Sequence, residues 1–290
     1  MSINPAKTWQ IIDLIKWGSD YFTQHGIENA RMEIEWLLSH HLGVQRVDLY
    51  VQYDRSLSPQ ELSGFKSMIK RRVSGEPFQY ILGVAPFYGR DFKVTRAVLI
   101  PRPESETLIQ VLRKGPPPTS ILDLGTGSGC LAITAALLYP NASTLATDIS
   151  QEALEVSREN AEELGAAEIT FQQLDILTTL PDEKFDAILC NPPYVAAKEI
   201  PDLQREIREH EPSLALTDHA DGLTFHRRLA DVGKSMLRQN GRMLVEIGGS
   251  AQAEGALSIY QKAGAQVLLH QDLQGDDRVC EVCWENGGTV

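Results

Sequence analysis

Ile121-Leu122-Asp123-Leu124-Gly125-Thr126-Gly127-Ser128-Gly129 is the stretch that decides the fold. A short apolar strand enters a loop with glycine at every second position, and the alanine- and leucine-rich segment Cys130–Leu138 follows as a predicted helix. Glycine lets the backbone turn tightly and lets a ligand approach without meeting a Cβ atom. Dinucleotide-binding loops have Gly-x-Gly-x-x-Gly, whereas the third glycine here comes one residue earlier. This spacing suits a ligand without a pyrophosphate, and a generic nucleotide site stays open as the alternative.

A strand–helix alternation continues from this stretch toward the end of the chain. It begins after Gly115–Pro118, and Ser150 is expected to cap a helix that runs to about Leu164. Another helix is expected between Asp221-Gly222 and Asn240. Strands are predicted at residues 121–124, 143–147, 169–174, 185–190, 242–247, 266–270 and 279–284. Such alternation is typical of a parallel sheet covered by helices, so the predicted fold class is α/β.

The first part of the chain has a different pattern. Residues from about Thr8 to Gly75 show the apolar periodicity of helices and no strand signal. Ser58-Pro59-Gln60-Glu61 has the features of a helix start: an N-cap, a proline in the first turn and a capping-box acid. The basic cluster Lys70–Arg72 is interpreted as a solvated helix end rather than a binding site. A small helical bundle that recognises or docks a partner is the expectation for this part.

Two strands and a proline-rich segment connect the helices to the alternating part. Pro77–Gly83 and Phe87–Val94 are predicted to form a hairpin. Ile100-Pro101-Arg102-Pro103-Glu104-Ser105-Glu106 then leads into an apolar helix, and its alternate prolines fix an extended entry. From the residues alone, a rigid linker and a functional segment are both open for this stretch.

Acidic residues follow the next two predicted strands. Asp148 comes about twenty residues after the glycine loop, at the carboxyl end of its strand, where a carboxylate can accept hydrogen bonds from both ribose hydroxyls. A turn or helix-cap role is the alternative, and the upstream glycine loop favours ribose binding. Asp175 has the corresponding position after the third strand, and Asp175 and Ile176 are candidates for contact with an adenine edge.

The strand Phe185–Cys190 stops at Asn191-Pro192-Pro193-Tyr194. Prolines have no backbone N–H, so the strand cannot keep pairing through them, and each proline pushes the preceding residue toward extended geometry. The result is a stiff turn that shows an amide side chain, free carbonyls and an aromatic ring. Because ligands bind outside the carboxyl ends of parallel strands, this turn is expected to share one edge of the sheet with the glycine loop and Asp148.

Taken together, these motifs resemble class I S-adenosylmethionine-dependent methyltransferases that act on amide or exocyclic nitrogen. Four further stretches resemble the HemK/PrmC family of protein-(glutamine-N5) methyltransferases. They are Glu76–Gly83, Ile100–Glu106, Glu211–Leu216 and Asp221–Leu223. The likeness extends from about Glu76 to the end, and the helical part agrees in size and placement. Ser105 replaces the threonine that is usual in the second stretch of that family.

The resemblance implies a domain organisation, a cofactor and a partner. It implies a helical substrate-recognition domain at residues 1–75, a β-hairpin linker at 76–98, and a methyltransferase domain at 99–290 with a Rossmann-like, mostly parallel seven-stranded sheet. S-adenosylmethionine is the implied cofactor, with S-adenosylhomocysteine as product. The implied substrate is the glutamine in the Gly-Gly-Gln loop of peptide chain release factors. No nucleic acid and no membrane is required.

Site residues follow from the same motifs. The predicted cofactor-binding residues are Gly125, Thr126, Gly127, Ser128, Gly129, Asp148, Asp175, Ile176 and Asn191. The predicted substrate-binding residues are Asn191, Pro192, Pro193 and Tyr194, of which Asn191, Pro192 and Tyr194 are the predicted catalytic ones. In this hypothesis the Asn191 side-chain oxygen and the Pro192 carbonyl each accept one hydrogen of the substrate NH2, and Tyr194 stacks on the planar amide.

Composition narrows the alternatives. The chain has 290 residues and a formal net charge of −12, which disfavours a broad electrostatic grip on nucleic acid. An adenine-N6 methyltransferase of DNA or RNA, a ribosomal-protein glutamine methyltransferase and a cofactor-binding interaction module stay open as rivals. Cys280 and Cys283 fall in a predicted strand and point to opposite faces, so no metal is expected. The absence of a signal peptide in Met1–Pro5 and of long apolar runs points to the cytoplasm.

Overall fold

The computed structural model describes residues 8–284, in two compact units that divide between Gly83 and Val84. Met1–Pro5, on which the expectation about a signal peptide rests, lies outside the described residues. The predicted linker at residues 76–98 is shared between the units, because its first part belongs to one and its second part to the other. Within the described residues, no helix combines the length and the apolar character needed to cross a membrane.

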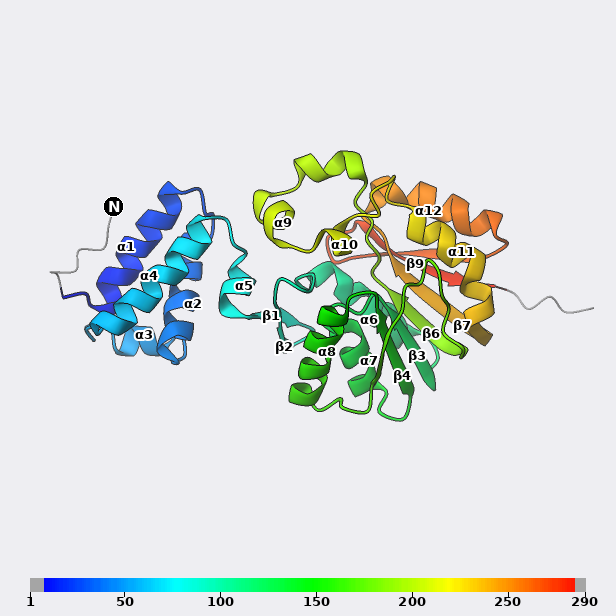
Figure 1. The fold of residues 1–290 in the computed structure, drawn as a ribbon, viewed down its shortest axis with the longest axis horizontal. Coiled ribbons are helices and arrows are strands. Elements are labelled where there is room, and N and C mark those ends of the chain that lie inside the picture. Colours follow the sequence, from blue (N-terminus) through cyan, green and yellow to red (C-terminus); the bar gives the residue numbers. More distant parts are fainter. Residues whose placement is uncertain (1–7, 285–290) are drawn as a thin grey trace, which may run out of the picture. The chain divides into compact units, whose positions relative to one another are not determined.

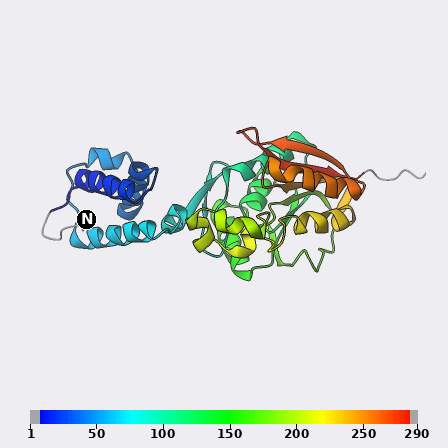
Figure 2. The same ribbon diagram turned by 90° about the horizontal axis from the view of Figure 1, so that it is seen from above.

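The first unit is helical, as the sequence predicts (Figure 1). Its helices are α1 (Ile11–Gln24), α2 (Ala30–Leu42), α3 (Asp48–Val51), α4 (Pro59–Val73) and α5 (Phe78–Leu82). α2 packs against both α1 and α4, and Figure 2 shows the helices of this unit from above. They enclose one apolar core that includes Leu14, Ile34 and Phe65, each fully buried.

Ser58 caps α4 as predicted. Its hydroxyl accepts a hydrogen bond from the Glu61 N–H at 3.2 Å, and the Glu61 carboxylate accepts one from the Ser58 N–H at 2.8 Å. The other end of α4 is solvated in part, as expected: Lys70 and Arg71 are exposed, whereas Arg72 is largely buried, and both arginines form ion pairs. Arg71 forms a two-pronged ion pair with Glu76, at 2.8 and 2.9 Å, and Arg72 contacts Glu33 at 2.7 Å.

The predicted hairpin is displaced along the chain. Pro77–Gly83 is not a strand: Phe78–Leu82 form the one-turn helix α5, which ends at Gly83 with φ +77°. A short apolar run with aromatic residues has no periodicity that separates a strand from a buried helix, which explains the error. The hairpin consists of β1 (Val84–Phe87) and β2 (Arg90–Lys93), with Tyr88 and Gly89 at positive φ in the turn.

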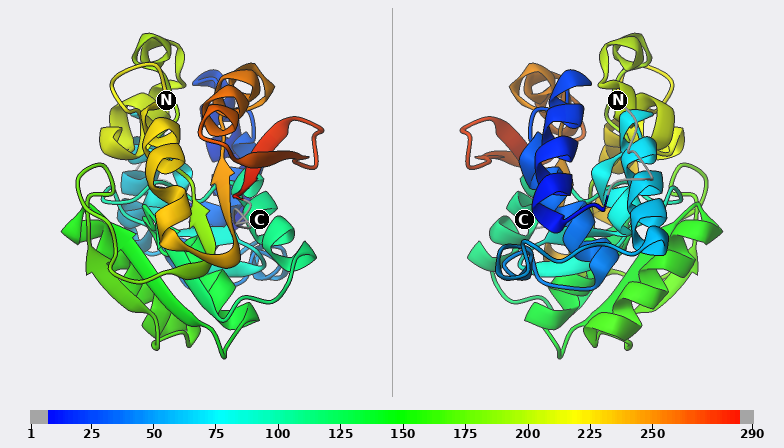
Figure 3. Two further views of the ribbon diagram at one scale, coloured as in Figure 1. Left: turned by 90° about the vertical axis from the view of Figure 1, so that its right-hand side faces the viewer. Right: turned by 90° about the vertical axis from the view of Figure 1, so that its left-hand side faces the viewer.

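The second unit contains a seven-stranded, mostly parallel sheet in the order β5-β4-β3-β6-β7-β9-β8, which confirms the predicted α/β class. Its strands are β3 (Ser120–Leu124), β4 (Ser143–Asp148), β5 (Thr170–Gln173), β6 (Phe185–Cys190), β7 (Leu237–Glu246), β8 (Gln266–Gln271) and β9 (Asp277–Cys283). β9 alone runs against the other six strands, because it is antiparallel to both β7 and β8. β9 and β8 form the red edge of the twisted sheet in Figure 3. The helix expected to run to Asn240 ends earlier, because β7 begins at Leu237.

Helices cover both faces of this sheet. One face packs on α6 (Glu106–Lys114), α7 (Cys130–Leu138) and α8 (Gln151–Leu164), and the other on α11 (Thr224–Met236) and α12 (Ser250–Lys262). Short helices complete the unit: η1 (Pro103–Ser105), η2 (Ala197–Asp202), α9 (Arg205–His210) and α10 (Ser213–Leu216). Burial on both faces explains why the central strands read as continuous apolar runs.

The cap of α4 gives a stability prediction. We expect Ser58→Ala to lower the free energy of unfolding of the first unit by about 1 kcal/mol, because the hydrogen bond from the Glu61 N–H to the Ser58 hydroxyl is lost. Urea unfolding followed by tryptophan fluorescence measures this, since Trp9, Trp17 and Trp36 are three of the four tryptophans. Ser63→Ala, an exposed position inside the same helix, is the matched control and should not destabilise. Equal losses for the two variants would contradict the capping role.

Candidate functional site

A cavity of about 450 Å³ opens at the carboxyl ends of β3, β4, β5 and β6. β4 and β6 lie on either side of β3, so the order of the strands along the chain reverses at β3. In parallel α/β sheets, ligand-binding crevices form at the carboxyl ends of the strands where this order reverses. The lining includes residues from all four strand ends, among them Gly125, Asp148, Asp175 and Asn191. The structure therefore brings together motifs that are far apart in the sequence.

The glycine loop forms one wall of this cavity. The N–H groups of Gly125 and Thr126 both donate to the Thr147 carbonyl at 2.9 Å, which ties the loop to β4. A Cβ atom on Gly125 or Gly127 would meet nothing within 4 Å, so the space beside these residues is free for a ligand. Gly129 is different: it has φ +82°, and a Cβ there would lie 2.8 Å from Ile133. The predicted loop residues Thr126, Ser128 and Gly127 also line the cavity.

Asp123, in the strand β3 that leads into the glycine loop, anchors the loop through its side chain. Its side chain is fully buried, and one carboxyl oxygen accepts hydrogen bonds from the Thr126 hydroxyl at 2.7 Å and the Ala132 N–H at 3.2 Å. The other oxygen has no hydrogen-bond partner among the described residues. Burial raises the pKa of Asp123 to about 7, because the charged form is poorly solvated there.

Asp148 lies at the end of β4 and lines the cavity, as the sequence predicts. One of its carboxylate oxygens accepts the Gly127 N–H at 2.9 Å, and the other accepts the Ser150 N–H at 2.9 Å. Each oxygen keeps a second lone pair for a ligand. Burial raises the pKa of Asp148.

Asp175 and Ile176 line the cavity next to Asp148. The Asp175 carboxylate accepts the Leu177 N–H at 2.9 Å and so shapes its own turn. Ile176 is 9% exposed, and its carbonyl accepts a hydrogen bond from Arg228 at 2.9 Å. A fixed apolar side chain beside an acid is suited to an aromatic ring with polar edges.

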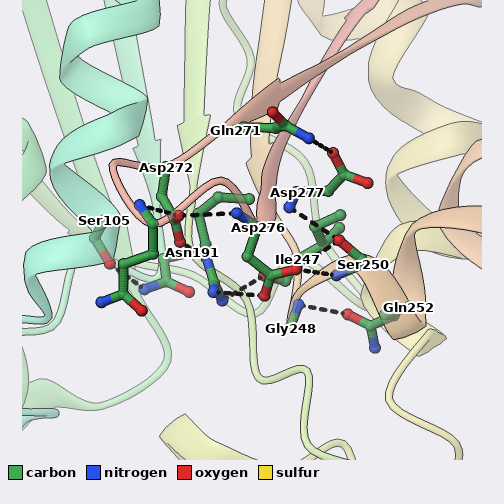
Figure 4. A network of polar contacts seen from close by, with 12 residues as sticks. Ser105, Asn191, Ile247, Gly248, Ser250, Gln252, Gln271, Asp272, Asp276 and Asp277 are labelled. Carbon is green, nitrogen blue, oxygen red and sulfur yellow. Dashed lines mark hydrogen bonds and ion pairs between the residues drawn. The ribbon is translucent and has the colours of Figure 1, made fainter.

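Asn191, Pro192 and Pro193 line the same cavity, where β6 ends. The Asn191 side-chain nitrogen donates to the Ser105 hydroxyl at 3.0 Å, and Figure 4 shows the two side chains pointing toward one another. The Ile100–Glu106 segment is thus part of the site wall, and Arg102 lines the cavity with Ser105.

Tyr194 is not among the residues that line the cavity. A Cβ atom on Gly248 would lie 3.0 Å from its ring, so the ring packs against the loop after β7. Burial raises the pKa of the Tyr194 hydroxyl, and the nearby carboxyl of Glu246 raises it further. The predicted stacking of Tyr194 on a substrate amide stays a prediction.

Further contacts brace the Asn191–Tyr194 turn and join the stretches around it. The Gln252 side-chain nitrogen donates to the carbonyls of Tyr194 and Gly222, at 3.1 and 3.0 Å. The buried Glu211 carboxylate accepts the Ile100 N–H at 3.2 Å and pairs with Arg102 at 2.6 Å. The stretches Ile100–Glu106, Glu211–Leu216 and Asp221–Leu223 therefore meet around this turn.

Sequence reasoning missed several members of the site. Arg102 and Ser105 belong to the Ile100–Glu106 segment, for which the sequence leaves a linker and a functional role open. Asp123, Glu246 and Gln252 are not among the site residues that the sequence predicts. Glu246 carried a readable signal, because it is the last residue but one of the predicted strand 242–247 and strand ends meet at the site edge. Within residues 8–284, no group of three His, Cys, Asp or Glu side chains could hold a metal ion.

Comparisons with known proteins place this arrangement in a family. The family model of the PrmC N-terminal domain matches residues 13–83, and that of the methyltransferase small domain matches residues 103–213. A release factor glutamine methyltransferase of Geobacter sulfurreducens is 40% identical over 273 residues, which cover 93% of this chain and 95% of that protein. The chain belongs to the release factor glutamine methyltransferase family.

Other likenesses agree with this membership and with the resemblance seen in the motifs. A family member from Chlorobaculum tepidum is 38% identical over 288 residues, which cover 94% of this chain and 96% of that protein. A solved methyltransferase structure from Pyrococcus furiosus shares the fold, with 16% identity and a TM-score of 0.51 over 76% of this chain and 97% of that one. Of the four family stretches, Glu76–Gly83 lies in the first unit, and the other three surround the Asn191–Tyr194 turn.

Asp123 gives a prediction about pH. Its pKa is about 7 in the fold and 3.8 in the unfolded chain, so its stabilising contribution is complete below pH 3.8 and is lost as pH rises through 7. Asp123→Asn cannot ionise. We expect its free energy of unfolding, relative to the unaltered protein, to rise by about 1.4 kcal/mol between pH 6 and pH 8.

Urea unfolding curves at several pH values measure this difference. Asp231→Asn, on the exposed side of α11, makes the same change of charge and is the control. A difference between the Asp123 variant and the unaltered protein that stays constant from pH 6 to pH 8 would contradict the raised pKa.

Proposed function

We propose that this protein transfers a methyl group from S-adenosylmethionine to the side-chain amide N5 of the glutamine in the Gly-Gly-Gln loop of peptide chain release factors. The observation that carries the proposal is the position of Asn191, which lies in one cavity with the glycine loop and Asp148. That cavity offers a nucleoside site and an amide site side by side. Membership in the release factor glutamine methyltransferase family supplies the substrate class.

The residues present fit the cofactor. Gly125 and Gly127 leave open space along the loop, and Asp148 keeps lone pairs for ribose hydroxyls. Asp175 and Ile176 would hold the adenine edge, and Thr126, Ser128, Gly129 and Asn191 complete the predicted set. When bound there, S-adenosylmethionine supplies an electrophilic methyl group and leaves as S-adenosylhomocysteine. No residue of this proposal holds a metal.

The chain's own part in the reaction is to hold and polarise the substrate amide. An amide nitrogen is a poor nucleophile, because its lone pair is delocalised into the carbonyl. The Asn191 oxygen and the Pro192 carbonyl would each accept one hydrogen of the substrate NH2. These bonds strengthen as positive charge develops on the nitrogen, so they favour the transition state over the ground state.

Pro193 and Tyr194 complete the predicted amide site. Pro192 and Pro193 have no backbone N–H, so their carbonyl oxygens are the only polar backbone groups of these two residues. Tyr194 would hold the amide plane, and Gln252 fixes its backbone carbonyl at 3.1 Å. Release factors are the proposed partners, with no requirement for nucleic acid or a membrane, and the cytoplasm is the expected location.

Replacing the acceptor glutamine tests the substrate. We expect label from S-adenosyl[methyl-³H]methionine to appear on a release factor, and to disappear when the Gly-Gly-Gln glutamine is replaced by alanine, because only an amide offers this NH2. Duplex DNA and ribosomal protein in parallel reactions test the rival substrates. Label on either of these, and none on the release factor, would contradict the proposed function.

Asn191→Ala tests the mechanism. It removes one acceptor of the substrate NH2, so we expect kcat to fall by about 100-fold or more, by analogy with the loss of one oxyanion-hole donor. Binding of S-adenosylmethionine, measured by calorimetry, should change little, because the glycine loop and Asp148 still hold the cofactor. Asn141→Ala, at an exposed turn before β4, is the matched control. Unchanged turnover by Asn191→Ala would contradict the role of Asn191.

A further inference from the structure

Ser105 is the last residue of η1 and leads directly into α6. Its backbone is already helical, with φ −65° and ψ −16°, so its side chain makes no capping bond. It is only 2% exposed. Its hydroxyl instead accepts the hydrogen bond from Asn191 at 3.0 Å. The hydroxyl hydrogen of Ser105 is therefore available for a second acceptor.

Glu246 is the buried carboxyl group on the strand beside Asn191. Cys190 of β6 pairs with Val245 of β7, so Asn191 and Glu246 come next on two neighbouring parallel strands. Glu246 ends β7 and is fully buried, and neither of its oxygens accepts a hydrogen bond of standard geometry among the described residues. Burial raises its pKa to about 7, and the hydroxyls of Ser105 and Tyr194 lie close enough to lower it in part. A buried carboxyl group without hydrogen-bond partners lowers the free energy of unfolding. Such a group is therefore expected to have a function that offsets this loss.

We propose that Ser105 and Glu246 are positioning residues that fix the orientation of the Asn191 amide. In this arrangement Asn191 donates to Ser105, Ser105 donates to Glu246, and the Asn191 oxygen is left to face the substrate. The inference deepens the proposed function and rests on it, because the substrate NH2 is the group that Asn191 would receive.

The direction of these bonds follows from the number of hydrogens. A carboxylate has only acceptors, and a serine hydroxyl has one hydrogen to donate. Once that hydrogen points at Glu246, Ser105 can only accept from Asn191, so the Asn191 nitrogen must face Ser105. The opposite orientation would place the Asn191 NH2 against the NH2 of the substrate, where two donors meet without an acceptor.

The negative charge of Glu246 also bears on the reaction. As methyl transfer proceeds, positive charge develops on the substrate nitrogen. Hydrogen bonds that all run toward one carboxylate polarise each other, so the charge at Glu246 strengthens the grip of the Asn191 oxygen. The Tyr194 hydroxyl also lowers the pKa of Glu246, which favours the ionised form of this carboxyl.

Substitutions at Ser105 separate the hydroxyl from its volume. We expect Ser105→Ala to lower kcat about tenfold, the order of one lost hydrogen bond, with little change in the KM for the release factor or in cofactor binding. Ser105→Thr keeps the hydroxyl and should restore kcat. Ser143→Ala, exposed at the start of β4, is the control. A full kcat for Ser105→Ala, or equal losses for the alanine and threonine variants, would overturn the positioning role.

Glu246→Gln separates positioning from stabilisation. We expect a lower kcat but, at pH 8, a higher melting temperature, because the unaltered protein must bury an ionised group and the variant does not. If Glu246 had only a structural role, its replacement by glutamine would lower both kcat and the melting temperature. That outcome would overturn the proposal. Glu254→Gln, on the exposed side of α12, controls for the lost charge.

A pH profile of kcat at saturating substrates gives an independent readout. Ionisable or polar groups that face Glu246 are Glu104, Ser105, Cys130, Cys190, Tyr194 and Arg278. Arg278 lowers its pKa and Glu104 raises it. Because the ionised form accepts from Ser105, kcat should fall as pH decreases below about 7, and Glu246→Gln should lack this fall. Asp123 has a similar pKa but is present in both proteins, so it cancels in the comparison.

The same reactions keep the two hypotheses apart. Absence of transfer by the unaltered protein would contradict the proposed function. Transfer by the unaltered protein together with an identical pH profile for Glu246→Gln would contradict only the positioning role.

Discussion

Two consecutive prolines end β6, and the rest of the site depends on this constraint. Pro192 and Pro193 have no N–H groups, so β6 cannot extend its pairing, and Asn191 is delivered at the edge of the sheet beside the glycine loop. The segment that follows obtains its anchors from distant parts of the chain. The Val195 N–H donates to the Leu216 carbonyl at 3.0 Å, and Gln252 donates to the Tyr194 carbonyl at 3.1 Å. Separate sequence stretches therefore act as one structural unit.

Buried acids occur on both sides of that unit. Asp123 lies in β3, just before the glycine loop, and Glu246 ends β7, the strand next to the one that leads into Asn191. Both are fully buried, and burial raises the pKa of each to about 7. Ionisation of either group works against folding at neutral pH. Asp123 accepts hydrogen bonds from the Thr126 hydroxyl and the Ala132 N–H and so orients the glycine loop. Glu246 is the proposed acceptor for the Ser105 hydroxyl, which orients the Asn191 amide. The central strands are covered by helices on both faces, and this extensive core can offset the local cost.

The sequence predicted the α/β unit well, because strands buried on both faces and capped helices have strong local signals. Phe185–Cys190 and Cys130–Leu138 have the predicted bounds, and Ser150 caps α8. Phe78–Leu82 was assigned wrongly because five residues are too few for a periodicity. The strand-end residues of the site were predictable for the same reason as the sheet. Ser105 was not, because its partner is 86 residues away and only the folded chain joins them.

The tetrapeptide by itself does not distinguish a nucleobase amine from a side-chain amide, since both offer a planar NH2. What the fold adds is direction. Ser105 accepts from Asn191 and has one hydrogen left, and Glu246 is a buried carboxyl at the end of the neighbouring strand β7. Hydrogen bonds that run from substrate to carboxylate leave an acceptor, not a donor, at the cavity wall. An acceptor at the cavity wall stabilises a substrate nitrogen that gains positive charge during the reaction. This stabilisation lowers the barrier most for the weakly nucleophilic amide.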